Sequence, residues 1–313
     1  MKKLIRAGAF IGVLLIIAFF ALQKKAIPLE ELKSKYANEH SQFLDMDGMK
    51  VHYRIEGEGK PIVLIHGTGA CLQTWDGWTD SLTAHGFKVI RLDMPAFGLT
   101  GPRKDNDYSI RMYVEFLDEF LSRHQIDTFA IAGNSLGGEI AWCYAVAHPE
   151  KVNNLILVDP AGFYSKDKGN KAIVFKLAKI KWLAALMAKI DTKVIVDKTV
   201  KDVYEDDSKI KKETIQMYYD MSMREGNRES FSARVQQIDS EKHPDISTIQ
   251  IPTLILWGKQ DKLIDVSMAD NFIKIPHSKL VVYDGVGHSP QEEIPAKSAE
   301  DVMSFIQNNQ SKN

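Results

Sequence analysis

The chain has 313 residues, of which 44% are hydrophobic and 26% are charged, a composition typical of folded globular proteins and unlike that of disordered or collagen-like chains. Forty lysine and arginine residues face 41 acidic residues, so the net charge of -1 gives no global reason to expect nucleic acid as a partner. Two cysteines, Cys71 and Cys143, are too few for a disulfide framework or a cysteine-based metal site.

The first 25 residues have the character of a membrane segment. Basic residues at positions 2, 3 and 6 precede an uncharged apolar run at 7–22, and two lysines follow at 24–25. A helix over this run reaches ~24 Å against ~30 Å of bilayer hydrocarbon, and snorkelling basic side chains can cover the difference. We expect 1–25 to be a single N-terminal membrane anchor with the rest of the chain extracytoplasmic, although basic residues flank both ends. The alternative is a cleaved signal sequence and a secreted protein, but no good small-residue cleavage site is present.

The next segments predict an α/β architecture. Residues 26–42 are polar and predict a helical linker, and residues 43–55 alternate around Asp47-Gly48, which predicts a β-hairpin. Further strands are expected at 61–65, 87–92, 129–132, 152–158, 251–257 and 279–283, and helices at 72–84, 109–123, 136–147 and 296–307. Short apolar strands separated by helices favour a mostly parallel sheet covered on both faces.

The alternation stops between residues 161 and 244. This stretch is rich in lysine and helical in character, so we expect a helical cap inserted between core segments 43–160 and 245–313. In its most apolar part, 173–190, a helical wheel gathers an apolar arc of ~100°. The arc consists of Ile173, Leu177, Ile180, Ala184, Met187 and Ala188. Because the lysines do not segregate opposite this arc, we favour a helix packed over the site. Contact with lipid and an acyl tunnel are the alternatives.

The pattern Gly133-Asn134-Ser135-Leu136-Gly137 lies between a predicted strand and a predicted helix. A G-x-S-x-G pattern in this context is typical of a strained turn that lifts a serine hydroxyl above a sheet. The glycines on either side remove side chains that would clash there. The helix that follows directs its N-terminal N–H groups toward the reacting oxygen. Ser135 is therefore the candidate nucleophile.

A serine hydroxyl is a weak nucleophile unless a base takes its proton. His288, in a glycine-flanked loop after the last predicted strand, is the candidate base. An acid must orient the imidazole, and Asp261, which follows the preceding strand, is our first choice. Asp159 at the end of the 152–158 strand and Asp265 are the alternatives.

The developing oxyanion needs preorganised donors. We expect one from the N–H of Leu136 and the other from the glycine-rich loop 66–70, where Thr68 is the first choice and Gly69 the second. The residues expected to contact the substrate are Gly69, Trp75 and Met187. Nothing in the sequence indicates a metal or organic cofactor, and nucleophilic catalysis by serine needs neither.

Five features together resemble the serine-hydrolase branch of the α/β-hydrolase superfamily. They are His66-Gly67, the sequence DMPAFG at 93–98, the pattern at 133–137, Asp261 and His288. The layout is similar to membrane-anchored monoacylglycerol lipases and bacterial lipase-like esterases. The resemblance implies an α/β-hydrolase fold with a mostly parallel eight-stranded sheet, and a catalytic triad of Ser135, Asp261 and His288.

The resemblance also implies an activity, the hydrolysis of carboxylic esters with an apolar acyl group through an acyl-enzyme on Ser135. The substrate would be a small ester or a lipid. The alternative is a C–C bond hydrolase of the ring-fission type, which shares the fold, the triad and the His-Gly-x-Gly loop at 66–69. A serine nucleophile argues against haloalkane dehalogenases and epoxide hydrolases, which use aspartate. One departure is visible, because the family often has glycine at the position of Ala96.

Overall fold

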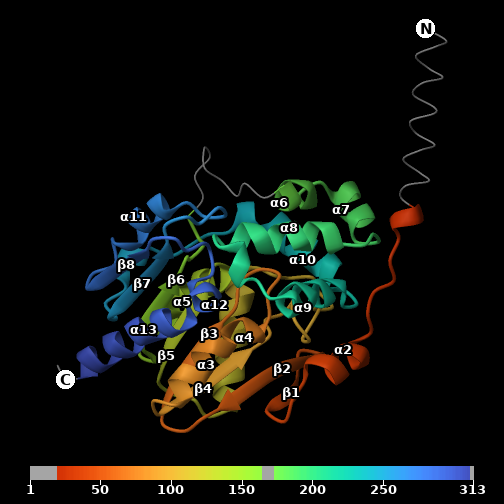
Figure 1. The fold of residues 1–313 in the computed structure, drawn as a ribbon. Coiled ribbons are helices and arrows are strands. Elements are labelled where there is room, and N and C mark those ends of the chain that lie inside the picture. Colours follow the sequence, from red (N-terminus) through yellow and green to blue (C-terminus); the bar gives the residue numbers. More distant parts are fainter. Residues whose placement is uncertain (1–19, 164–172, 311–313) are drawn as a thin grey trace.

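The computed structural model describes residues 20–163 and 173–310, and eight strands in this part of the chain form one sheet (Figure 1). The strands are β1 (Ser41–Met46), β2 (Met49–Glu56), β3 (Lys60–Ile65), β4 (Phe87–Leu92), β5 (Phe129–Asn134), β6 (Val152–Val158), β7 (Thr253–Gly258) and β8 (Ser278–Tyr283). Their order is β1-β2-β4-β3-β5-β6-β7-β8. Strand β2 runs antiparallel to both its neighbours, and the other pairs are parallel. The expected eight-stranded, mostly parallel sheet is confirmed.

The hairpin between β1 and β2 turns at Asp47-Gly48. Both residues have positive φ, 52° at Asp47 and 73° at Gly48. A two-residue turn of this kind matches the twist of the flanking strands, and aspartate and glycine tolerate its left-handed backbone. The pairing of Met46 with Met49 sets the register of the hairpin.

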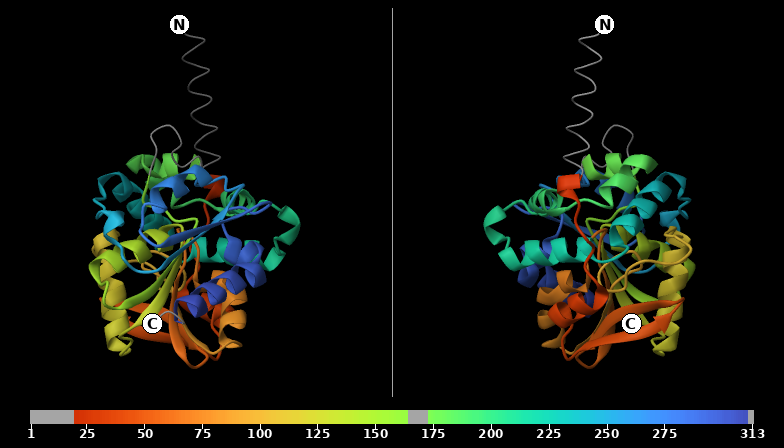
Figure 2. Two further views of the ribbon diagram at one scale, coloured as in Figure 1. Left: turned by 90° about the vertical axis from the view of Figure 1, so that its left-hand side faces the viewer. Right: turned by 90° about the vertical axis from the view of Figure 1, so that its right-hand side faces the viewer.

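Helices cover both faces of the sheet because successive side chains of a strand point to opposite faces. In β3, Ile62 and Leu64 face a core shared with α3 (Asp76–Thr83) and α13 (Pro295–Gln310). Val63 and Ile65 face the opposite core, which is shared with α4 (Ile110–Arg123) and α5 (Leu136–Ala147). Figure 2 shows these layers from two sides.

The segment expected as a linker is packed against the rest of the protein. It contains α2 (Leu29–Tyr36), whose Leu32 is fully buried against Cys71, Leu99 and Met221. Leu29 and Tyr36 on the same helix pack against this cluster, so the apolar residues of a mostly polar segment anchor it.

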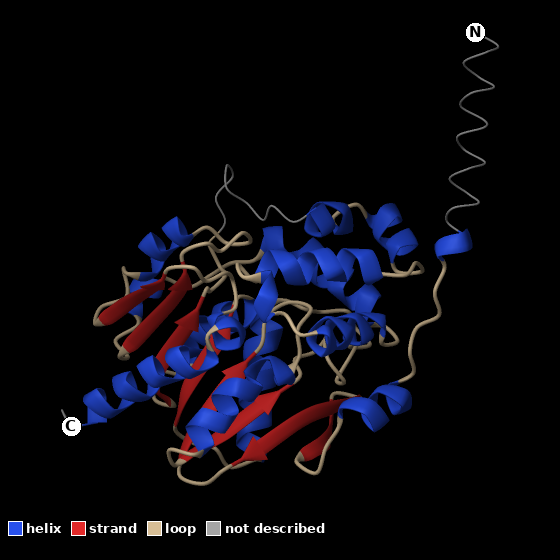
Figure 3. Cartoon of the chain, viewed as in Figure 1, coloured by secondary structure: helices blue, strands red, loops and turns tan. Residues whose placement is uncertain are grey.

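Between β6 and β7 the described chain is helical and contains no strand (Figure 3). Its main helices are α6 (Ile173–Ala178), α7 (Lys181–Met187), α8 (Lys193–Val203), α9 (Lys212–Met223) and α10 (Asn227–Gln237). The expectation of one helix over 173–190 is wrong. The backbone is extended at Ile180, with φ -90° and ψ 100°, and α6 and α7 each turn to contact α10. The apolar arc therefore splits, and Ile180 is 43% exposed.

Among residues 20–163 and 173–310, no helix has the length and hydrophobicity needed to cross a membrane. Most of the anchor expected at 1–25 lies outside these described residues.

The close contact between α5 and β3 predicts the effect of a methyl group at Gly137. A Cβ at this position would lie 2.0 Å from the carbonyl oxygen of Ile65, a backbone atom that cannot move aside. We expect Gly137→Ala to lower the free energy of unfolding by about 3 kcal/mol or more, or to prevent accumulation of folded protein. Gly86, with φ 77° and open space around it, is the matched control. Gly86→Ala should cost only about 1–2 kcal/mol of backbone strain. Equal losses in thermal or urea unfolding would contradict the close contact.

Candidate active site

Ser135 occupies the turn between β5 and α5 with φ 54° and ψ -117°, a left-handed backbone that is strained for a residue with a side chain. Two backbone hydrogen bonds hold the turn. The N–H of Ser135 donates to the carbonyl of Val158 at 3.0 Å, and the carbonyl of Ser135 accepts from the N–H of Ala161 at 2.9 Å. A Cβ at Gly133 would lie 2.0 Å from the carbonyl oxygen of Gly137, so only glycine fits there. The turn thus presents the Ser135 hydroxyl to a cavity above the sheet.

His288 lines the same cavity as Ser135. Its Nδ1 lies 2.6 Å from Oδ2 of Asp261, and both side chains are buried. The other oxygen of Asp261 accepts the backbone N–H groups of Leu263 at 2.7 Å and Ile264 at 2.9 Å. These bonds fix the carboxylate, which in turn holds the imidazole with a proton on Nδ1 and leaves Nε2 free to accept one.

Asp261 is therefore the acid that contacts His288. Asp265 is used elsewhere, because its carboxylate accepts the N–H of Ser267 at 3.0 Å as a helix cap. Asp159 lies behind the pair, and its Oδ1 accepts the N–H of Gly258 at 2.9 Å.

Asp159, Asp261 and His288 together bring their possible ligand atoms within 4.8 Å of one another. A tetrahedral zinc ion at ~2.0–2.2 Å from each ligand would hold two ligand atoms roughly 3.3 Å apart. The 2.6 Å between Nδ1 of His288 and Oδ2 of Asp261 is instead the length of a direct, charge-assisted hydrogen bond. The cluster fits proton handling rather than a metal ion.

The two buried carboxyl groups have different surroundings. Burial raises the pKa of Asp159 well above its usual range, and the nearby negative charge of Asp261 raises this pKa further. Burial therefore favours the protonated form of Asp159, the carboxyl group that does not contact the imidazole.

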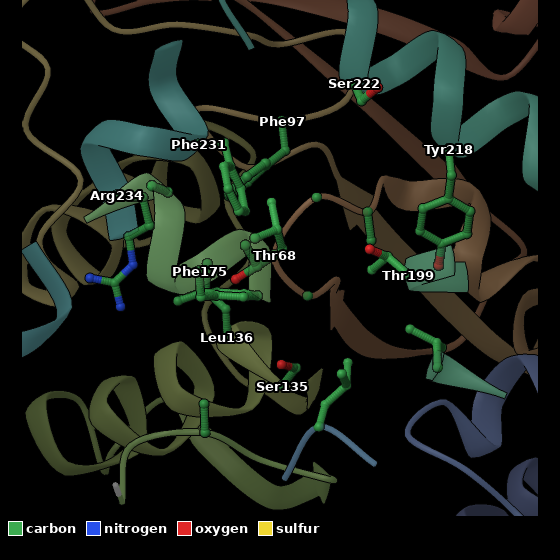
Figure 4. Close-up of a pocket in the computed structure, with 18 of the residues that line it drawn as sticks. Thr68, Phe97, Ser135, Leu136, Phe175, Thr199, Tyr218, Ser222, Phe231 and Arg234 are labelled. Carbon is green, nitrogen blue, oxygen red and sulfur yellow. The ribbon is translucent and has the colours of Figure 1, made fainter. Parts of the chain in front are cut away.

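The loop expected to hold the oxyanion is organised by His66. Burial lowers the pKa of His66, so its ring is neutral. One ring nitrogen donates to the Gly67 carbonyl at 2.8 Å, and the other accepts the N–H of Met94 at 3.0 Å. Thr68 and Leu136 both line the cavity that Ser135 lines, and all three are labelled in Figure 4. Leu136 is the first residue of α5, where an N–H has no acceptor within the helix.

Ala96 keeps the backbone that glycine favours, although it has a side chain. Its φ is 84°, and its N–H donates to the carbonyl of Gly101 at 2.7 Å. Alanine in place of glycine therefore does not change the left-handed backbone of this loop, but it lowers the free energy of unfolding by about 1–2 kcal/mol.

The cavity has a volume of about 680 Å³ and extends from Ser135 under the cap helices. Apolar side chains from both parts form much of its wall, including Phe97 from the core, and Phe175 and Phe231 from the cap (Figure 4). The rings of Phe175 and Phe231 meet edge to face, with centroids 5.5 Å apart. The cavity is thus shaped for an apolar group of substantial size.

Two of the three expected substrate contacts, Gly69 and Met187, line the cavity. Trp75 does not belong there. It is fully buried in the core between the sheet and helices α3 and α13, with its ring 4.9 Å from that of Trp78. Its place near the oxyanion loop in sequence is misleading because the short helix after that loop, Leu72–Trp75, turns the indole toward the sheet.

A buried ion-pair network beside the cavity escaped the sequence analysis. Glu139 on α5 and Arg234 on α10 are both fully buried, and their side chains are 3.4 Å apart. Glu139 also contacts His243 at 2.7 Å, and Arg234 contacts Glu241 at 2.5 Å. The four residues come from the core and the cap, so no spacing along the chain could indicate that they meet.

A family model described as alpha/beta hydrolase fold matches residues 60–295. The chain belongs to this family. Among curated relatives, it is 28% identical over 286 residues to 2-hydroxy-6-oxo-6-(2'-aminophenyl)hexa-2,4-dienoic acid hydrolase of Metapseudomonas resinovorans, covering 88% of this chain and 93% of that protein. It is also 28% identical over 263 residues to monoacylglycerol lipase ABHD6 of Homo sapiens, covering 80% and 76%.

A solved structure of a meta-cleavage product hydrolase from Pseudomonas fluorescens superposes on this α/β hydrolase with a TM-score of 0.74 and 25% identity, covering 86% of this chain and 97% of that one. The relatives thus include ester hydrolases and C–C bond hydrolases at similar identity. Family membership shows that the protein is a hydrolase. It does not distinguish an ester bond from a C–C bond as the bond that is cleaved.

The raised pKa of Asp159 predicts how stability depends on pH. As pH rises above the ordinary pKa of aspartate, about 3.9, the unfolded chain releases this proton while the folded chain keeps it. The Asp159 carboxyl therefore lowers the free energy of unfolding increasingly between pH 4 and the raised pKa. We expect Asp159→Asn to be more stable relative to the wild type at pH 8 than at pH 5, by urea unfolding.

Asp127, an exposed aspartate, supplies the control. Asp127→Asn should change stability by the same small amount at both pH values. If Asp159→Asn also showed no dependence on pH, the neutral state of Asp159 would be wrong.

Proposed function

We propose that this α/β hydrolase cleaves carboxylic esters that carry an apolar acyl group. The observation that carries the proposal is the position of Ser135, on a strained turn in the wall of an apolar cavity that also contains His288 bonded to Asp261. A substrate whose acyl chain fills the cavity would bring its carbonyl carbon to the Ser135 hydroxyl.

The reaction follows from this arrangement. Nε2 of His288 takes the proton of Ser135 as its oxygen attacks the carbonyl carbon, and Asp261 stabilises the imidazolium through Nδ1–H. The N–H groups of Thr68 and Leu136 stabilise the oxyanion. His288 then protonates the leaving alcohol, which departs and leaves an acyl-enzyme on Ser135. A water molecule, deprotonated by His288, releases the acid and restores the serine.

Neutral substrates suit the charges around the cavity better than carboxylates. Of the described residues that line it, four are lysines or arginines: Lys176, Lys179, Arg228 and Arg234. Arg234 is held by Glu139 and Glu241, Lys179 by Asp239, and Arg228 donates to the Ile190 carbonyl. Lys176 is exposed to solvent. At Arg234 and Lys179 a dienoate carboxylate would compete with carboxylates that are already in place, whereas a neutral ester needs no cationic partner.

C–C bond hydrolysis remains the second candidate because the meta-cleavage relatives match the chain over as much of its length as the lipases do. It would use the same serine, histidine and aspartate on a carbon leaving group. A ring-fission dienoate provides the comparison substrate.

We also propose that residues 1–25 hold the enzyme at a membrane. The uncharged run at 7–22 and its basic flanks support this proposal. Recovery of the full chain in the membrane fraction, resistant to carbonate extraction, would agree with it, and release as a shortened soluble chain would indicate a cleaved signal instead.

Ester hydrolysis is tested with p-nitrophenyl esters of two to sixteen carbons. We expect the highest kcat/KM for medium or long chains, because the cavity buries apolar surface. Ser135→Ala should lower kcat by about 10³-fold or more without loss of folding. The matched control is Ser232→Ala, another serine at the cavity wall, which should stay within a few-fold of wild type. Consumption of a dienoate with every ester untouched would overturn the ester proposal in favour of C–C cleavage.

The role of Met187 gives a test of where the acyl chain lies. Met187→Trp would fill part of the cavity, so we expect kcat/KM for a twelve-carbon ester to fall about tenfold relative to a four-carbon ester, about 1.4 kcal/mol. Met187→Ala should shift the preference toward longer chains. If neither variant changed the ratio, the acyl chain would not occupy this part of the cavity.

A further inference from the structure

The exposed apolar side chains of this protein are unevenly distributed. Among the described residues, nine large hydrophobic side chains are exposed, and six of them come from residues 20–22 and 180–194. These six are Phe20, Leu22, Ile180, Trp182, Leu186 and Val194, which we call the cap patch. Trp182 is 68% exposed and Val194 is 81% exposed. Side chains of this size gathered in one region usually mark an interaction site.

Backbone hydrogen bonds bring the two parts of the cap patch together. The N–H of Asp191 donates to the carbonyl of Leu22 at 2.8 Å, and the N–H of Lys24 donates to the carbonyl of Lys189 at 3.0 Å. Gln23 and Ile190 form an antiparallel bridge between these bonds. The chain near residue 22 therefore runs beside the link between α7 and α8, as both views in Figure 2 show.

Helix α7 separates the cap patch from the cavity. Trp182 and Leu186 are four residues apart, so they lie on the same side of the helix, and both are exposed. Ala184 is buried and Met187 lines the cavity, so the other side of α7 faces inward. A partner bound to Trp182 and Leu186 would therefore be separated from the cavity at Ser135 by the thickness of helix α7.

The charges around the cap patch favour an anionic partner. Residues 20–25 and 179–194 contain six lysines and one aspartate. All six lysines are exposed, in a chain whose net charge is -1. Three of them lie near acidic side chains, Lys24 at 3.6 Å from Asp191, Lys179 at 2.7 Å from Asp239 and Lys193 at 3.6 Å from Asp197. An exposed tryptophan with aliphatic neighbours and a border of lysines is the composition that proteins place at a lipid–water interface.

The position of the chain points to the same partner. The uncharged run at 7–22 ends within the cap patch, since Phe20 and Leu22 belong to both. If residues 7–22 insert into a membrane, the cap patch is the part of the described chain next to the membrane surface.

We propose that the cap patch docks on an anionic lipid bilayer, with Trp182 and Leu186 in the interface and the lysines near the lipid phosphates. Lipid contact, one of the alternatives for residues 173–190, thus falls on the outer side of α7, while Ala184 and Met187 keep its inner side packed over the cavity. The docking does not depend on ester hydrolysis, and its first test is read without turnover.

Tryptophan fluorescence offers that test. The protein has five tryptophans, and Trp75, Trp78, Trp142 and Trp257 are fully buried, which leaves Trp182 as the reporter. The full chain is reconstituted into bilayers of phosphatidylcholine and phosphatidylglycerol, with or without bromine on the acyl chains. We expect bromolipids to quench up to about one fifth of the emission, the share of one tryptophan in five. Trp182→Phe should remove this quenching. No quenching, or equal quenching in the variant, would overturn the proposal.

A paired variant separates docking from catalysis. The double variant Trp182→Ser with Leu186→Ser should lower hydrolysis of a long-chain monoacylglycerol held in anionic vesicles at least tenfold, with a soluble four-carbon ester hydrolysed at the wild-type rate. The control, Leu280→Ser with Val282→Ser, removes exposed apolar side chains on β8, far from α7 in sequence, and should leave both activities unchanged. Equal losses in the two double variants would contradict the proposal.

A second copy of the chain is the other possible occupant of the cap patch. In that case Trp182 would be shielded in detergent without lipid, and dilution would expose it. That outcome, read by acrylamide quenching against concentration, would replace lipid docking with self-association. If no variant and no wild-type sample hydrolysed any ester, the proposed function would fail while the fluorescence result still decided the docking.

Discussion

The backbone of Ser135 holds a φ of 54°, a conformation that costs a residue with a side chain about 1–2 kcal/mol, and the surrounding structure enforces it. The turn is bonded to β6 through Val158 and to the loop after it through Ala161. Gly133 and Gly137 approach other backbone atoms so closely that neither can carry a side chain. These hydrogen bonds and close backbone contacts stabilise the strained turn and hold the Ser135 hydroxyl at the cavity. The other residues of the site are arranged around this hydroxyl.

The cap is bonded to the loop that carries His288. The N–H of His288 donates to the carbonyl of Val203 at the end of α8, at 2.7 Å. The buried carboxylate of Glu293 accepts the N–H of Gly287 in this loop at 2.7 Å and the N–H of Asp206 in the cap at 2.9 Å. One side chain thus ties the histidine loop to the cap. The position of the imidazole is therefore tied to the end of α8 in the cap.

Charge is distributed sparingly around the site. Burial disfavours the charged forms of Asp159 and His66, raising the pKa of the first and lowering the pKa of the second, and the charges of Glu139 and Arg234 compensate each other. Asp261 lies 2.6 Å from Nδ1 of His288, the position from which a carboxylate can stabilise an imidazolium. The mostly apolar lining of the cavity supports the proposal of neutral substrates.

Local patterns in the sequence determined the sheet, the hairpin, the family and the choice of Ser135, His288 and Asp261 as candidates, because strand periodicity, turn residues and the glycine pattern act over a few neighbouring residues. Tertiary structure decided what depends on residues far apart in the chain. It placed Asp159 behind Asp261, joined Glu139 to Arg234, and packed Trp75 into the core instead of the cavity. It also broke the apolar segment 173–190 at Ile180 and joined residue 22 to residue 191, which set the cap patch at the surface. These features depend on burial and on contacts between residues that are distant in sequence. The spacing of residues along the chain does not show either.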